Sequence, residues 1–306
     1  MKFLFVGLGS IGQRHLKNLH TLVGNSNEDC VIDALRRTES QELPDFSGLI
    51  DNLYTDIADI PYDYDAVFIT NPSNLHYETL LKVKDRTNAV FIEKPVFSTP
   101  DIDIASLNLK DDGIYYVACP LRRSPVLSRV SDMVRDKKPL AVRAICSSYL
   151  PDWRPSADYT KSYSANASMG GGVRLDLIHE WDYLVSLFGF PSRVESISSK
   201  VSNLSIDSED IAIYIADYKD MTVSLHLDYF GRHAKREMEL IFDDKTLKAD
   251  ILNNRIVFEN ENKTEVFSPA DIHFLEMSYF LDLIKGRKEN INTVAHAYKV
   301  VQLALK

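Results

Sequence analysis

The chain has 306 residues, roughly twice the length expected of one domain, so we expect two domains. Hydrophobic residues make up 45% and charged residues 26%, an ordinary globular composition that excludes a disordered, collagen-like or coiled-coil chain. Lys and Arg number 35 against 44 Asp and Glu, so the net charge is −9. This acidic balance argues against a nucleic-acid partner, because phosphate backbones attract basic surfaces.

The sequence predicts a cytoplasmic protein with neither disulfides nor a membrane span. Its cysteines, Cys30, Cys119 and Cys146, are odd in number, lack CxxC spacing and lie in apolar stretches, so we expect packed thiols and no structural zinc. The apolar start, residues 2–6, breaks at Gly7 and predicts a buried strand rather than a signal peptide. No run of about 18 apolar residues follows, so we expect no transmembrane helix.

Short apolar runs alternate with helical patterns in the first third of the chain, which is typical of βαβ units around a parallel sheet. The pattern predicts a doubly wound α/β Rossmann domain over residues 1–120. Its elements in chain order are a strand at Lys2–Val6, a helix at Ile11–Leu22, strands at Val31–Leu35 and Ala66–Thr70, a helix at Leu75–Lys84, a strand at Ala89–Ile92, a helix at Asp101–Leu107 and a strand at Tyr115–Cys119.

Beyond Pro120, longer strands follow one another with few helices between them, which favours an antiparallel sheet. We predict an α+β domain over residues 121–306 with a large, mostly antiparallel open sheet. Its elements are a helix at Leu121–Arg135, a strand at Leu140–Tyr149, a helix at Val173–Phe188, strands at Arg193–Val201, Asp210–Tyr218, Met221–Tyr229, Arg236–Phe242 and Arg255–Glu259, and helices at Ile272–Lys285 and Thr293–Leu305.

A glycine-rich turn links the first predicted strand to the first predicted helix. It reads Gly7-Leu8-Gly9-Ser10-Ile11-Gly12, which is a GxGxxG pattern in the position where dinucleotides bind. The first glycine permits the tight turn, the second lets the backbone approach a pyrophosphate, and the third lets helix and strand pack closely. The helix N-terminus adds free N–H donors for that anion. The turn therefore predicts a dinucleotide site.

The end of the second strand indicates which dinucleotide binds. An acid there would bond the ribose 2′-hydroxyl of NAD, whereas arginine suits the 2′-phosphate of NADP. Asp33 could be that acid if the strand ends early, but Arg36 and Arg37 follow the predicted end. We therefore favour NADP over NAD, with a solvated loop as the alternative role for the two arginines.

Four motifs together resemble the glucose–fructose oxidoreductase / inositol dehydrogenase (Gfo/Idh/MocA) family over essentially the whole chain. They are the glycine-rich turn, Thr70-Asn71-Pro72, Glu93-Lys94-Pro95 and the segment Gly170-Gly171-Gly172-Val173-Arg174-Leu175-Asp176-Leu177-Ile178-His179-Glu180-Trp181-Asp182. The resemblance implies a Rossmann domain, a second domain with a large open sheet, a nicotinamide cofactor and a sugar, cyclitol or related substrate.

The resemblance also implies roles for particular residues. Lys94 matches the family's catalytic lysine, and the Lys94–Pro95 bond is expected to be cis. Asp176 and His179 match its acid and its proton-transferring histidine. Only two residues separate them here, whereas the family pattern has three, and this shorter spacing resembles members from surface-polysaccharide and sugar-nucleotide gene clusters. On one continuous helix, a three-residue offset would still put both side chains on one face.

The same residue types suit the chemistry independently. Removing hydride from a carbinol carbon requires a base for the hydroxyl proton, and a histidine such as His179 titrates near working pH. The Lys94 ammonium could stabilise the developing alkoxide. Asp176 could orient the imidazole, bind a substrate hydroxyl or only complement its helix dipole.

Further contacts are expected around these groups. Thr70, Asn71, Pro72, His76 and Glu93 join Lys94 as expected cofactor contacts on the family pattern. A polar and aromatic stretch before the glycine run supplies candidate sugar contacts, because sugars stack on aromatic rings. These candidates are Trp153, Arg154, Tyr159 and Tyr163, with packing against the sheet or a neighbouring subunit as the alternative.

The sequence thus predicts an NAD(P)-dependent oxidoreductase acting on a hydroxyl or ketone of a sugar or sugar derivative, including nucleotide-linked sugars. Two alternatives remain: a redox-neutral epimerase or lyase with retained cofactor, and a dinucleotide-binding regulator without chemistry. We expect no bound metal, because the histidines are scattered. A homodimer or homotetramer is expected, since an open sheet face favours association.

Overall fold

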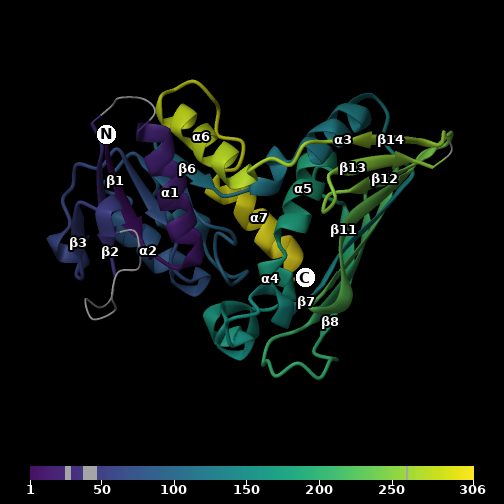
Figure 1. Ribbon diagram of the computed structural model, residues 1–306, viewed down its shortest axis with the longest axis horizontal. Coiled ribbons are helices and arrows are strands. Elements are labelled where there is room, and N and C mark those ends of the chain that lie inside the picture. Colours follow the sequence, from purple (N-terminus) through teal and green to yellow (C-terminus); the bar gives the residue numbers. More distant parts are fainter. Residues whose placement is uncertain (25–28, 37–46, 260) are drawn as a thin grey trace. The chain divides into compact units, whose positions relative to one another are not determined.

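The computed structural model describes residues 1–24, 29–36, 47–259 and 261–306 (Figure 1). These form two compact units: unit 1 comprises Met1–Ala118 and Asp271–Lys299, and unit 2 comprises Cys119–Ala270 and Val300–Lys306. The structure therefore differs from the predicted continuous domains 1–120 and 121–306, because residues 271–299 return to the first unit.

Unit 1 is built on a six-stranded parallel sheet, which confirms the predicted doubly wound fold. Its strands are β1 (Lys2–Val6), β2 (Val31–Leu35), β3 (Asn52–Tyr54), β4 (Ala66–Ile69), β5 (Ala89–Ile92) and β6 (Ile114–Val117). They lie in the order β3-β2-β1-β4-β5-β6, so the order reverses between β1 and β4. Ligands of open α/β sheets bind outside the carboxyl ends of the strands at such a reversal.

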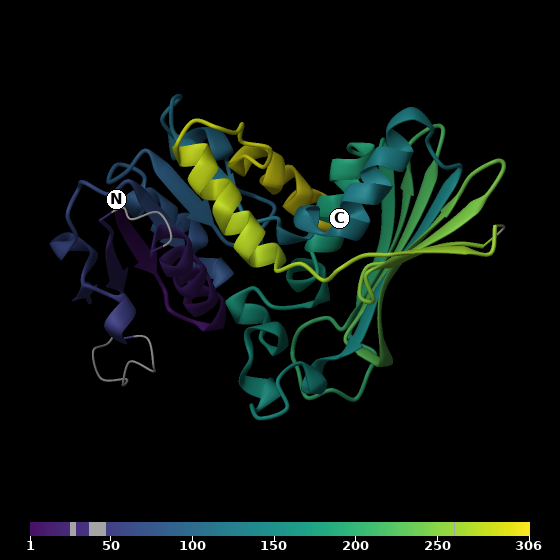
Figure 2. The ribbon, with the colours of Figure 1, turned by 45° about the horizontal axis from the view of Figure 1, so that its top comes forward.

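Helices cover the sheet of unit 1, and two of them begin in the returning segment. They are α1 (Ser10–Gly24), α2 (His76–Val83), α6 (Ile272–Ile284) and α7 (Val294–Ala304), the last running into unit 2. Helices α1 and α6 lie side by side (Figures 1 and 2). Phe280 of α6 packs against Phe68 and Phe91 of the sheet, with ring centroids 5.5 and 5.3 Å apart. This shared aromatic core explains why the segment belongs to unit 1.

The predicted helix at 101–107 is only a short 3₁₀ turn, Ile104–Leu107.

Unit 2 contains an eight-stranded sheet, which confirms the predicted large and mostly antiparallel sheet. Among the strands described, only the β7–β10 pair is parallel. In spatial order they are β14 (Lys263–Val266), β13 (Arg255–Phe258), β12 (Thr246–Asp250), β11 (Phe230–Ile241), β7 (Ala141–Tyr149), β10 (Thr222–Asp228), β9 (Ile211–Asp217) and β8 (Arg193–Ser199). Strands β3, β12 and β14 were not predicted, because each is short and carries little apolar pattern.

Helices cover one face of this sheet (Figure 2). They are α3 (Pro125–Asp136), α4 (Val173–Asp176) and α5 (His179–Phe188). Trp181 of α5 is fully buried and meets Tyr214 of β9 edge-on, with centroids 5.2 Å apart. Alternation along β9 turns Ile213 and Ile215 to the opposite face, where no described helix covers them.

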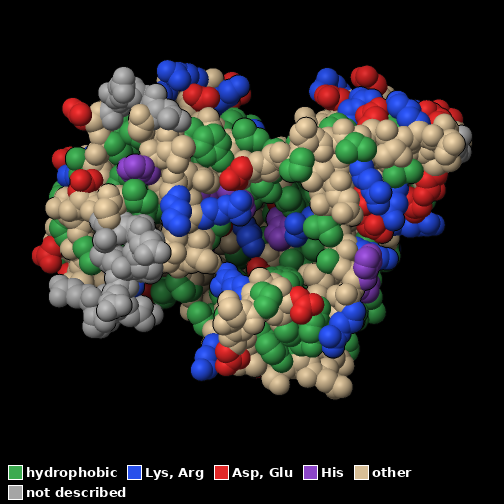
Figure 3. All heavy atoms as spheres, in the orientation of Figure 1, with side chains coloured by type: hydrophobic (Ala, Val, Ile, Leu, Met, Phe, Trp, Pro, Cys, Tyr) green, Lys and Arg blue, Asp and Glu red, His purple; other side chains and the backbone are tan. Residues whose placement is uncertain are grey.

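On the face of the molecule shown in Figure 3, positive and negative side chains intermix over the strands of unit 2. Arg143 of β7 pairs with Glu239 of β11 at 2.9 Å, and Lys248 pairs with Glu237 at 2.8 Å. Within the ranges that the structure describes, no helix is both long and apolar enough to cross a membrane.

Candidate active site

The turn between β1 and α1 packs tightly against the segment that follows β4. Gly7 has φ = 95°, and a Cβ at this position would lie 2.7 Å from the backbone of Asn71. The Thr70 hydroxyl donates to the Gly7 carbonyl at 2.6 Å. Only glycine combines this conformation with this close approach. The first glycine of the motif thus holds two loops together at the reversal point of the sheet.

The rest of the turn presents open backbone. Gly9 is exposed, and a Cβ built on it would meet no atom within 4 Å. Ser10 and Ile11 then begin α1, whose first turn contains no acidic residue. The positive dipole end of this helix is therefore not neutralised by a carboxylate within that turn. An open cradle beside such a helix end fits the pyrophosphate of a dinucleotide.

The candidate residues for cofactor choice lie at and beyond β2. Asp33 lies in mid-strand and is fully buried, accepting hydrogen bonds from the Tyr64 hydroxyl at 2.6 Å and the Asn52 amide at 2.8 Å. The strand does not end early, so Asp33 is a buried structural acid instead of a ribose contact. Arg36 follows directly and is half-buried, whereas Arg37 lies outside the described residues.

The segment after β4 is held in place by a buried histidine. His76 is 1% exposed, and its two ring nitrogens lie 2.9 Å from the carbonyls of Asn71 and Pro95. Burial lowers the pKa of His76, although the contacts with the two carbonyls oppose this shift. His76 therefore links the loop containing Asn71 and half-buried Pro72 to the loop containing Lys94, and any effect on a cofactor passes through those loops.

Lys94 follows β5, and its neighbour Glu93 anchors it. Glu93 is 6% exposed; its carboxylate bonds the buried His15 ring of α1 at 2.5 Å and accepts from the Lys94 backbone N–H at 3.1 Å. Burial alone would raise the pKa of Glu93, but the hydrogen bond and charge of His15 lower it to about 2. The Lys94–Pro95 bond is cis, as the family resemblance implied.

The predicted single helix over residues 173–188 is wrong. The structure has α4 ending at Asp176 and α5 beginning at His179, with Leu177 at ψ = 21°, outside the helical range. Leu177 and Ile178 are both buried, so the chain turns there to place two consecutive apolar side chains in the core. The helical-face argument for Asp176 and His179 therefore does not apply.

Asp176 belongs to a polar and aromatic cluster. Its Oδ2 accepts from the Ser164 hydroxyl at 2.5 Å and from the Tyr229 hydroxyl at 3.2 Å. Tyr229 is buried, and burial together with the Asp176 charge raises its pKa well above the usual value, so it remains a donor. The ring of Trp153 meets Tyr229 edge-on at 5.4 Å and is 39% exposed. Thus the structure brings predicted residues Trp153 and Asp176 together through Tyr229.

The other substrate candidates are distributed along the same loop. Tyr163 donates its hydroxyl to the Gly170 carbonyl at 2.5 Å, and the Tyr159 hydroxyl accepts from the Ser205 backbone at 3.2 Å. Arg154 is exposed. The two tyrosines therefore stabilise the fold of the loop, whereas Arg154 lies on its surface.

His179 begins α5 and contacts an ion pair between buried Glu180 and partly exposed Arg236. Arg236 of β11 donates from Nε to Glu180 Oε1 at 2.8 Å and from a terminal nitrogen to His179 Nε2 at 2.8 Å. Glu180 has no exposed side-chain surface, and His179 is 14% exposed. Burial alone would raise the pKa of Glu180, but the charge of Arg236 lowers it to about 2. Both members of the pair are therefore ionised at neutral pH.

Sequence reasoning missed Tyr229 and Arg236. The signal was present in the strand alternation, because Arg236 shares a strand face with Met238 and Leu240, both fully or almost fully buried. A charged residue on a buried face requires a partner. Tyr229 similarly follows Leu227 in a series of alternate, buried positions, and it is the one member of that series with a hydroxyl group.

Comparison with known proteins finds a family match in the N-terminal third of the chain. Residues 1–105 match the sequence model described as "Oxidoreductase family, NAD-binding Rossmann fold". The resemblance to the Gfo/Idh/MocA oxidoreductase family is thus confirmed for residues 1–105. Over 201 residues, which are 63% of this chain, it is 27% identical to the scyllo-inositol 2-dehydrogenase (NAD(+)) of Bacillus subtilis (strain 168). The match spans 55% of the length of that relative.

Solved structures share the fold of the chain. The UDP-N-acetylglucosamine 3-dehydrogenase from Acidithiobacillus ferrooxidans superposes with a TM-score of 0.80 at 16% identity, covering 100% of this chain and 95% of that one. The WlbA dehydrogenase from Bordetella pertussis, in complex with NADH and UDP-GlcNAcA, gives a TM-score of 0.81 at 15% identity, covering 100% and 94%. At these identities the likeness shows the fold alone.

The glycine turn yields a paired prediction. Gly9→Ala adds a methyl group to open space, so we expect its free energy of unfolding to stay within about 0.5 kcal/mol of wild type. Dinucleotide affinity should nevertheless fall about tenfold or more, because the methyl group enters the cradle. Gly7→Ala is the contrasting variant, since its methyl group meets the Asn71 backbone, and it should lose stability as well. Denaturant titration and fluorescence titration with NADPH check both; unchanged affinity in Gly9→Ala would contradict the cradle assignment.

The Glu93–His15 pair predicts a pH dependence. A carboxyl whose folded pKa lies below its unfolded value of about 4.3 stabilises the protein above that value, and the stabilisation is lost as pH falls toward the folded pKa of about 2. Glu93→Gln should therefore lower the free energy of unfolding at pH 7 by about 2–3 kcal/mol and flatten its decline between about pH 4.5 and 2. Denaturant titrations across this range measure both effects. The exposed Glu78→Gln serves as control, and a Glu93→Gln profile parallel to wild type would refute the pair.

Proposed function

We propose that the protein is an NAD(P)-dependent oxidoreductase that transfers a hydride between nicotinamide and a hydroxyl or ketone of a sugar or sugar derivative. The observation that carries this proposal is the open backbone cradle at Gly9 beside the uncompensated first turn of α1. The oxidoreductase family of the chain and its dehydrogenase relative support the reaction class.

The bound dinucleotide would supply the hydride acceptor or donor. Backbone groups from Gly7 to Gly12 would hold its pyrophosphate, and Asn71 and Pro72 follow the adjacent strand at the same edge of the sheet. We propose NADP as the preferred form, because Arg36 follows β2 while Asp33 is buried within it. Fluorescence titration with NADPH and NADH tests this preference, and tighter binding of NADH would overturn it.

We propose a sugar-type substrate because of the Asp176 cluster in unit 2. A carboxylate, a tyrosine hydroxyl and the partly exposed ring of Trp153 combine hydrogen-bond acceptors with an apolar stacking surface, which is what a polyol requires. Two fold relatives bear names that refer to UDP-linked sugars, which supports including nucleotide-linked sugars in this class.

Lys94, Asp176 and His179 are the proposed catalytic residues. A lysine ammonium can donate to the reacting oxygen and stabilise developing negative charge. His179 and Asp176 are held by separate partners, Arg236 and the Ser164–Tyr229 pair, so each has a fixed orientation before substrate binds.

Turnover measurements test this assignment. Lys94→Ala and His179→Ala should each lower kcat about 10²–10⁴-fold, because each removes a group that transfers or stabilises a proton at the reacting oxygen. Their dissociation constants for NADPH should stay near wild type. Exposed residues of the same types, in Lys82→Ala and His233→Ala, are matched controls. Lost dinucleotide binding with unchanged turnover per bound cofactor would overturn the assignment, and dinucleotide binding without turnover on any sugar in the wild type would favour a regulator.

We also propose that the uncovered sheet face of unit 2 forms a homodimer or homotetramer. Three isoleucines of this face are exposed: Ile197 of β8 by 71%, and Ile213 and Ile215 of β9 by 36% and 50%. Ile197 lies directly opposite Ile213. An apolar sheet face of this kind favours association with another copy.

A charge placed on this face should weaken association. Ile197→Lys should shift the protein toward monomer in light scattering at micromolar concentration, because a lysine opposite Ile213 is costly to desolvate. Leu252→Lys, at an exposed position after β12, is the matched control. A wild-type protein that is already monomeric would remove the proposal.

A further inference from the structure

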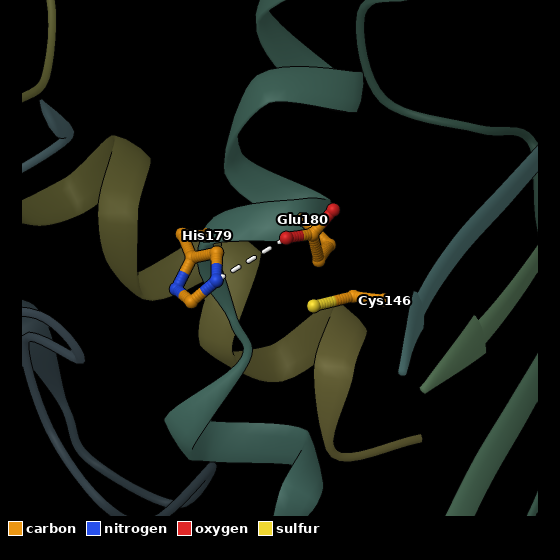
Figure 4. Close-up of side chains that lie close together, drawn as sticks. All are labelled: Cys146, His179 and Glu180. Carbon is orange, nitrogen blue, oxygen red and sulfur yellow. Dashed lines mark ion pairs between the residues drawn. The ribbon is translucent and has the colours of Figure 1, made fainter. Parts of the chain in front are cut away.

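The guanidinium of Arg236 is the centre of a compact cluster in unit 2. Besides Glu180 and His179, it contacts Cys146 Sγ of β7, with a terminal nitrogen at 3.5 Å. Figure 4 shows the three acceptors converging from α5 and β7, with His179 Nε2 turned toward Glu180. One cation therefore serves three different side chains.

This cluster has the residue types of a metal site. Cys146, His179 and Glu180 form the one group of potential metal ligands found within the described ranges, with ligand atoms within 4.8 Å of one another. Arg236, however, already donates to all three, and its fixed charge repels a second cation. Burial and the Glu180 charge also raise the pKa of Cys146, which favours the thiol over the thiolate that zinc requires. The arrangement is that of a hydrogen-bonded arginine and not of a metal centre.

We propose that Arg236 is a positioning residue that holds neutral His179 as the Nδ1–H tautomer. A guanidinium is always protonated and has no acceptor atom, so a terminal N–H directed at Nε2 at 2.8 Å must be the donor. Nε2 then provides the lone pair, and the single proton of the neutral ring resides on Nδ1.

Glu180 fixes this geometry. Its Oε1 accepts from Arg236 Nε at 2.8 Å and lies 3.2 Å from His179 Nε2, where it could otherwise accept a proton from the ring. The Nε bond orients the planar guanidinium, so the terminal N–H that meets Nε2 cannot rotate away without breaking a buried ion pair. A proton on Nε2 would clash with that N–H.

The tautomer changes the role first expected for His179. Nδ1 lies on the side of the ring away from Glu180 and Cys146 (Figure 4), and it carries N–H. His179 therefore donates a hydrogen bond to the reacting oxygen instead of acting as its base. On oxidation, a bound nicotinamide would accept the hydride, and the hydroxyl proton would go to a carboxylate such as that of Asp176. This catalytic consequence rests on the proposed function, whereas the tautomer itself does not.

Nuclear magnetic resonance of the full chain with ¹⁵N-labelled histidine tests the tautomer without cofactor or substrate. At pH 8, the His179 signals, assigned by their loss in His179→Asn, should show a protonated Nδ1 and an unprotonated Nε2. The double variant Arg236→Gln/Glu180→Gln removes both charges of the pair together, which avoids leaving Glu180 buried and unpaired, and its His179 should shift toward Nε2–H. Arg143→Gln/Glu239→Gln removes a more exposed ion pair, which joins β7 to β11, and should leave the tautomer unchanged.

The two possible failures are distinguishable. A wild-type His179 protonated on Nε2 overturns the proposal even if the double variant does not fold, and so does a tautomer that is unchanged in a folded double variant. If the protein turns over a sugar, the double variant should also lose kcat about 10²-fold while its NADPH dissociation constant stays near wild type. Absent turnover in the wild type would refute the proposed function and leave the tautomer result standing.

Discussion

The ion pair between Glu180 and Arg236 is the interaction on which the candidate catalytic side of unit 2 depends. Glu180 has no exposed side-chain surface, so its charge is tolerable only beside a permanent cation. Removing one partner of such a pair costs about 3–5 kcal/mol, because the other charge stays buried. The pair also joins α5 to β11 beside His179, the first residue of α5. This one ion pair therefore neutralises the buried charge of Glu180 and also orients the ring of His179, a candidate catalytic residue.

In unit 1, close packing of the backbone fixes the positions of the loops that form the candidate cofactor site. Gly7 lies so close to the Asn71 backbone that the loops after β1 and β4 behave as one surface, and the Thr70 hydroxyl closes the contact. The buried His76 and Glu93 extend this arrangement to the loop after β5. Backbone atoms, rather than mobile side chains, thus define the cradle, which suits a ligand recognised by its pyrophosphate.

Local patterns made most of the fold predictable. The glycine turn depends on a few consecutive residues, and β4 and β5 both read Ala-Val-Phe-Ile because both faces of a parallel sheet are covered. Three features depend on distant residues and could not be read in this way. Helix α6 returns to unit 1 because Phe280 completes an aromatic core begun by Phe68, and the break after Asp176 follows from burying two adjacent apolar side chains. The partner of His179 lies 57 residues further along the chain.

The return of α6 has a consequence for how the chain acquires its structure. Unit 2 is inserted between strand β6 and helix α6, so neither unit is a single continuous segment. During synthesis, Phe91 emerges about 190 residues before Phe280, which at ribosomal rates corresponds to roughly 10–40 s. Throughout that interval the nascent sheet lacks the helix that covers its phenylalanines, and an exposed apolar face is a binding surface for chaperones. Unit 1 is therefore the first unit whose synthesis begins, but it can finish folding only after most of unit 2 has been synthesised.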